Sequence, residues 1–90
     1  MSESLNKTII ESIKKYDFES ASKAVAELFA TDMNSPKPHI FLGIISELQK
    51  NKPEAMRHFR AALALDGTDQ VALYNLYRVG DGSREPIRFE

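Results

Sequence analysis

A 34-residue period runs through this chain and restricts its fold more than any other feature of the sequence. Apolar or identical residues recur at this spacing, and the pairs are Ala21 with Ala55, Val25 with Phe59, Leu28 with Ala62, and Asp32 with Asp66. The pair Leu42 and Gly43 is followed at the same spacing by Leu76 and Tyr77. A period of this length is typical of repeated helix-turn-helix units, each of which buries its apolar face against the next.

Apolar residues recur at helical spacing along almost the whole chain. A first stripe runs from Leu5 to Tyr16, and further helices are predicted over about residues 19–31, 38–50, 53–65 and 70–79. The third of these is apolar on nearly all sides, which predicts that other helices surround it. Gly67 is expected to end the fourth helix in a left-handed conformation, and Asp69 to cap the fifth. The predicted fold class is therefore all-α, with about five antiparallel helices.

Residues 36–69 resemble the tetratricopeptide repeat (TPR) family, most closely in their second half. Leu42 and Gly43 look like the Leu-Gly pair in the first helix of that repeat, and LALD at 63–66 is similar to its usual LELD ending. ALYNL at 72–76 looks like the start of another repeat. The resemblance implies that the alanines of the second helix let it approach its neighbours closely, while the aromatic residue fills the space between. The repeat-packing residues that it implies are Leu42, Gly43, Ala55, Phe59, Ala62 and Leu76.

The resemblance also implies an organisation for the whole chain. Residues 1–80 would form one domain, a short right-handed α-solenoid of antiparallel helix-turn-helix units. Repeat one would span about 2–35, repeat two 36–69, and an extra helix at 70–79 would cover the apolar end of the array. Residues 81–90 would follow as a tail. Three residues depart from the family, which usually has an aromatic residue, a tyrosine and a proline at the positions of His39, Ser46 and Gly67.

Charge and composition argue against several classes of protein. The 12 basic and 13 acidic residues are mixed along the chain, so nothing in their pattern predicts binding to nucleic acid or to a membrane surface. There is no cysteine, no signal-peptide core near the N-terminus, and no apolar run longer than IFLGII at 40–45. We therefore expect a cytoplasmic protein.

The residues that could carry chemistry do not form a catalytic pattern. His39 and His58 lie on different predicted helices without the further ligands of a metal site. No GxSxG motif or phosphate-binding glycine loop is present, and GDGSR at 80–84 lacks the repeated carboxylates of a calcium loop. We expect a protein that is not an enzyme and that needs no cofactor or metal.

The resemblance to TPR proteins implies a binding site on the concave face, which the first helix of each repeat lines. The residues at those positions are Asn6, Ile10, Lys37, Ile40, Ile44, Glu47, Tyr74 and Arg78. Ile13 shares this face, and the isoleucines could equally be core. Tyr74 and Arg78 are favoured as partner contacts because they lie one turn apart and combine an aromatic ring with a guanidinium group. The cationic clamp with which some TPR proteins hold a chaperone's C-terminal carboxylate is missing.

Two functions follow as expectations. In the first, the chain is a scaffold module that binds a protein or peptide on the concave face. In the second, it assembles with itself, and the groove or the open end of the array is a homodimer interface. The tail, with apolar Ile87 and Phe89 in a polar segment, is expected to lie across its own groove or that of a neighbour.

Overall fold

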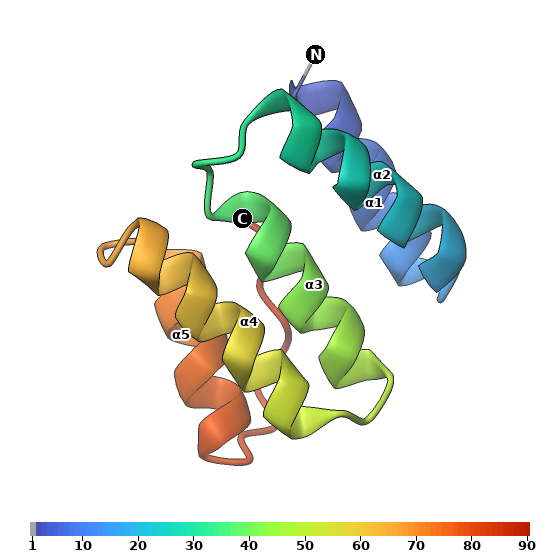
Figure 1. The fold of residues 1–90 in the computed structure, drawn as a ribbon. Helices are drawn as coiled ribbons and strands as arrows, with labels where there is room; N and C mark the ends of the chain where they lie inside the picture. The colour runs from blue at the N-terminus through green and yellow to red at the C-terminus, as the bar shows by residue number, and fades with distance from the viewer. Residues whose placement is uncertain (1) are drawn as a thin grey trace.

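The computed structural model describes residues 2–90, and these residues form five helices and no strand (Figure 1). The helices are α1 (Ser2–Lys14), α2 (Phe18–Thr31), α3 (Lys37–Leu48), α4 (Lys52–Leu65) and α5 (Gln70–Gly80). Residues 81–90 follow without regular secondary structure. The predicted all-α fold with five helices is confirmed. In this part of the chain no helix is long and apolar enough to cross a membrane.

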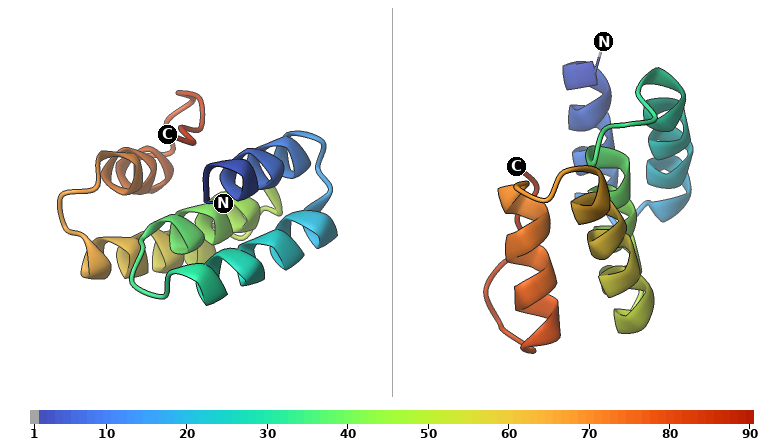
Figure 2. Two further views of the ribbon diagram at one scale, coloured as in Figure 1. Left: turned by 90° about the horizontal axis from the view of Figure 1, so that it is seen from above. Right: turned by 60° about the vertical axis from the view of Figure 1, so that its left-hand side comes forward.

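The helices pair in the order in which they occur in the chain. α1 and α2 form one antiparallel hairpin, α3 and α4 form a second, and α5 packs against α4 and α3 (Figure 1). α2 packs against α3 and so joins the two hairpins, which makes α3 the central helix, as expected. Seen from above, α2 and α4 lie on one side of the array, whereas α1, α5 and the tail lie on the other (Figure 2).

The backbone repeats with the same period as the sequence. α2 begins at residue 18 and α4 at residue 52, and the two helices end at residues 31 and 65. Asp17 and Asn51 cap them in the same way, because each side chain accepts a hydrogen bond from the backbone N–H three residues further on. The preceding turns match as well, since the Asp17 N–H donates to the Ser12 carbonyl and the Asn51 N–H to the Ser46 carbonyl, both at 2.9 Å.

The corner inside each hairpin is made by a left-handed residue that is not glycine. Tyr16 has a φ of 60° and Lys50 a φ of 67°, and these two positions are again one period apart. A side chain in this conformation costs roughly 1–2 kcal/mol. The capping bonds of the helix that follows, which close the same turn at both corners, offset this cost.

The prediction that Gly67 ends α4 in a left-handed conformation is wrong. Among residues 2–90, Gly82 is the glycine that adopts a positive φ. Asp66 instead leaves α4 in an extended conformation, with φ −146° and ψ 94°. Its carboxylate accepts hydrogen bonds from the backbone N–H and the hydroxyl of Thr68, at 3.0 and 2.7 Å. These bonds lower the pKa of Asp66. They also close the turn after α4, so that no glycine in the left-handed conformation is needed there. Asp69 caps α5, as predicted.

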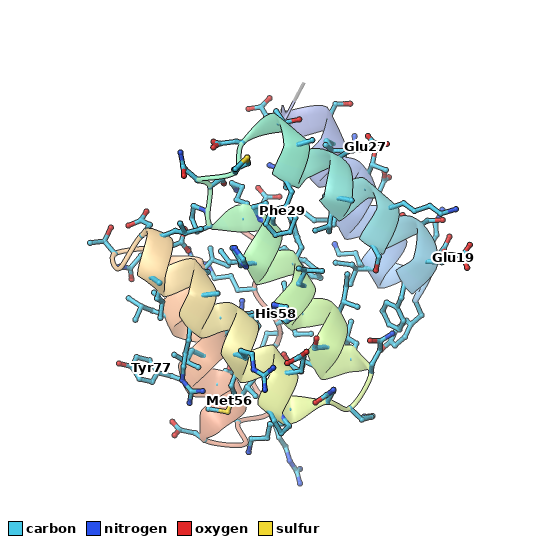
Figure 3. The ribbon with its side chains drawn as sticks, in the orientation of Figure 1. Glu19, Glu27, Phe29, Met56, His58 and Tyr77 are labelled. Carbon is cyan, nitrogen blue, oxygen red and sulfur yellow. The ribbon has the colours of Figure 1, made fainter. Side chains whose placement is uncertain are left out.

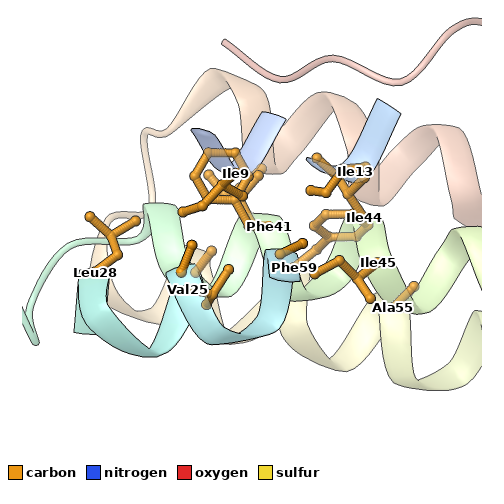
Figure 4. Close-up of a cluster of buried hydrophobic side chains, with 14 of the residues drawn as sticks. Ile9, Ile13, Val25, Leu28, Phe41, Ile44, Ile45, Ala55 and Phe59 are labelled. Carbon is orange, nitrogen blue, oxygen red and sulfur yellow. The ribbon is translucent and has the colours of Figure 1, made fainter. Parts of the chain in front are cut away.

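The core lies where the two hairpins and α5 meet, and small residues let its helices come close together (Figure 4). Ala55, Phe59 and Ala62 of α4 have no solvent exposure. A Cβ atom added at Gly43 of α3 would lie 2.6 Å from Cε1 of the Phe59 ring. Because real Cβ atoms do not approach a carbon this closely, the contact between α3 and α4 requires glycine at position 43.

Candidate functional site

The tail returns along the face formed by α1, α3 and α5 (Figure 2). It leaves α5 through a turn in which the Ser83 N–H donates to the Arg78 carbonyl at 2.9 Å. The Glu85 N–H then donates to the Ser83 hydroxyl at 3.1 Å. From there the chain runs back beside α5 and reaches α1. We call the surface beneath residues 86–90 the tail-bound face.

The Asn75 side chain holds the tail by its backbone. Its Nδ2 donates to the Arg88 carbonyl at 2.8 Å, and its Oδ1 accepts from the Arg88 N–H at 3.2 Å. One amide side chain thus pairs with both backbone groups of one residue, as a neighbouring β-strand would. The Tyr74 hydroxyl adds a further backbone contact by donating to the Pro86 carbonyl at 2.7 Å. None of these three bonds depends on the identity of a tail side chain.

The apolar residues of the tail alternate with exposed ones. Ile87 and Phe89 are half-buried and pack against the core, whereas Pro86, Arg88 and Glu90 are exposed. An extended segment places every second side chain on the same side, so the two apolar residues face the helices together. Lys14 of α1 lies over the Phe89 ring, with its Nζ 5.5 Å from the ring centroid. The tail therefore joins α5 to α1.

A buried ion pair fixes the orientation of Asn75. Arg78 is 7% exposed, and both of its terminal nitrogens donate to the Glu47 carboxylate of α3, through Nη1 at 2.6 Å and through Nη2. Arg78 also donates from Nε and Nη2 to Asn75 Oδ1, at 3.4 and 3.3 Å. Because a guanidinium group only donates, the atom of Asn75 that faces it must be the oxygen. The amide nitrogen is thereby directed at the Arg88 carbonyl.

Beyond the end of the tail the face continues as an open hollow of about 800 Å³. Asn6 and Ile10 of α1, Lys37 of α3 and the terminal Glu90 are among the residues that line it. The Asn6 Oδ1 atom is buried and accepts no hydrogen bond from any residue that the structure describes. The tail thus occupies only part of the face.

The residues expected on the concave face all lie on α1, α3 or α5, but they differ in accessibility. Asn6, Ile10 and Lys37 line the hollow, and Tyr74 bonds to the tail. Core positions are occupied by Ile13, Ile40 and Ile44, which are at most 3% exposed. Glu47 and Arg78 neutralise each other, so neither presents an unpaired charge to a partner.

Asn75 makes two of the tail contacts and was not among the expected binding residues. Its side chain has no solvent exposure, because it lies on the buried face of α5 together with Ala72 and Val79. A buried amide must find partners for its nitrogen and its oxygen, because an unpaired polar group costs roughly 1–3 kcal/mol. An asparagine amid the apolar residues of α5 was therefore the one signal in the sequence for this contact.

The two histidines lie away from the tail-bound face. His39 packs edge-on against Phe29, with ring centroids 5.1 Å apart. His58, on α4 (Figure 3), has a lowered pKa because burial disfavours its charged form; nearby Glu54 opposes this shift. Across residues 2–90 no three histidine, aspartate or glutamate side chains come together in a way that could hold a metal ion.

Comparisons with models of protein families, with curated proteins and with solved structures find no match for this chain.

Proposed function

We propose that this chain is a non-catalytic protein-interaction module, built as a short TPR-like array, that binds a protein partner on the face of α1, α3 and α5. The observation that carries this proposal is the extended tail on that face, held by Tyr74 and Asn75. A face that holds one extended segment through backbone hydrogen bonds and apolar contacts has the chemistry to hold another. The hollow beside Glu90 offers further surface to a longer segment.

The repetition of the backbone supports the TPR-like part of the proposal. Equivalent caps at Asp17 and Asn51, and equivalent left-handed corners at Tyr16 and Lys50, recur after one period of the sequence. The close approach at Gly43 fits the role that the family gives to its small residues. These features support a stack of two helical hairpins closed by α5.

The proposal can be tested by selecting binders from a library of random peptides displayed on phage. The target is the full-length chain carrying Ile87→Ser and Phe89→Ser, which weakens the contact of its own tail. Amide chemical-shift changes on adding a selected peptide should then concentrate in α1, α3 and α5. Changes confined to the opposite side, on α2 and α4, or a failure to select any binder, would contradict the proposed site.

A matched pair of charge reversals gives a second test of the site. Lys37 and Lys52 are the first residues of α3 and α4. Lys37 lines the hollow, whereas Lys52 does not. Lys37→Glu should change the affinity of peptides that extend into the hollow, and Lys52→Glu should leave it unchanged. Equal effects of the two substitutions would place the binding site elsewhere.

A further inference from the structure

We infer that the partner segment on this face is an extended peptide with large apolar residues at alternate positions, and that the chain's own C-terminal tail competes with it. This inference rests on the function proposed above and specifies its ligand. The tail is the template, because Ile87 and Phe89 face the helices while Arg88 between them is held by its backbone.

The backbone hydrogen bonds and the apolar side-chain contacts have different roles in recognition. Asn75 and Tyr74 bond only to backbone atoms of the tail, so they accept any extended segment whose middle residue has a free N–H. Selectivity must then come from the two side chains that face the helices, as in other strand-like complexes. Lys14 over the Phe89 ring favours an aromatic residue at the second apolar position, since a cation is attracted to the face of a ring.

The position of the tail makes competition unavoidable. A partner segment cannot bond to Asn75 while the Arg88 backbone occupies both atoms of its amide. The tail is anchored to the end of α5 by a short connection, so its effective concentration at the face is on the order of 1 mM. Against a free peptide with a dissociation constant of about 0.1 mM, this weakens apparent binding roughly tenfold.

The direct test uses a synthetic peptide with the sequence of residues 82–90, GSREPIRFE. Its affinity is measured by fluorescence anisotropy for the wild-type chain and for the full-length Ile87→Ser, Phe89→Ser variant. The peptide should bind the variant and bind the wild-type chain about tenfold more weakly. The control is a peptide of the same composition in which residues 87 and 88 are exchanged, so that its apolar residues are adjacent; it should not bind.

A second variant guards against loss of the fold in the first. Arg88→Pro removes the backbone N–H that bonds to Asn75 and changes a side chain that is exposed. It should release the tail and raise peptide affinity in the same way. Circular dichroism should give both variants the helix content of the wild-type chain.

Three results would overturn the inference. These are equal affinity of the peptide for wild-type chain and variants, equal binding of the control peptide, and no binding of the 82–90 peptide at all. If library peptides without alternating apolar residues still shift amides of α1, α3 and α5, the proposed function stands and only this inference fails. If no peptide of any kind shifts them, the proposed function fails as well.

Discussion

Replacement of Gly43 by alanine should destabilise the domain, although alanine is the better helix former. A Cβ at this position would lie 2.6, 2.8 and 2.9 Å from Cε1, Cδ1 and Cζ of Phe59. The ring has no solvent exposure and packs within the core, so it has little room to move. Overpacking of a core costs roughly 1–3 kcal/mol, and alanine recovers about 1 kcal/mol of helix propensity relative to glycine.

The expected net loss for Gly43→Ala is therefore about 1–2 kcal/mol, toward the upper end of the overpacking range because three ring atoms are involved. In a domain of this size such a loss lowers the melting temperature by roughly 4–15 °C. The assay is urea unfolding followed by circular dichroism, with thermal melting as a second readout. Gly43→Ala with a stability equal to or above that of the wild-type chain would refute the argument for close approach.

Gly80→Ala is the matched control. Gly80 also lies in a helix, but its added Cβ would meet nothing closer than Met56 Cε at 3.5 Å, an ordinary contact. The free energy of unfolding should stay the same or rise by up to about 1 kcal/mol. In addition, Phe59→Leu should relieve part of the clash with an alanine at position 43. The loss in free energy of unfolding of the double variant should therefore be about 1 kcal/mol smaller than the summed losses of the two single variants.

Three further predictions concern the ion pair, a histidine and a helix cap. Glu47→Gln leaves the Arg78 charge uncompensated and should lower the free energy of unfolding by about 2 kcal/mol in urea titrations. Burial lowers the pKa of His58 below 6.5. As the pH falls through 6.5, the unfolded state therefore takes up a proton before the folded state does, and the free energy of unfolding declines. His58→Gln should flatten this pH dependence in thermal melts between about pH 8 and 5. Asn51→Ala removes the cap on the Glu54 N–H and should cost about 1 kcal/mol, measured by urea unfolding; no loss would mean that the cap is unimportant.

The number and positions of the helices were predictable because their signals are mostly local. The all-round apolar character of residues 38–50 and the capping residue Asp69 can each be read from a short stretch of sequence. The left-handed corners at Tyr16 and Lys50 were not predictable, since neither residue type favours that conformation. Hydrogen bonds on both sides of each corner impose it.

The details of the site depended on contacts between residues distant in sequence. Arg78 looked like a free cation for a partner, but Glu47 lies 31 residues away and its carboxylate was not foreseeable as the counter-ion. Asn75 bonds to the Arg88 backbone. Its place among the apolar residues of α5 indicates that a buried amide needs a partner, but it does not indicate which backbone group that partner is. The tail lies on α1 and α5, two of the three helices that were expected to line the binding face.

The measurement that tests the central claim most directly is amide hydrogen exchange in the full-length chain, followed by NMR. The Arg88 N–H bonds to buried Asn75 Oδ1, whereas the Arg84 N–H donates to no residue that the structure describes. With the tail docked, Arg88 should exchange about tenfold more slowly than in the free 82–90 peptide, and Arg84 should exchange at the peptide rate. Exchange of Arg88 at the free-peptide rate would contradict the claim that this face holds an extended segment.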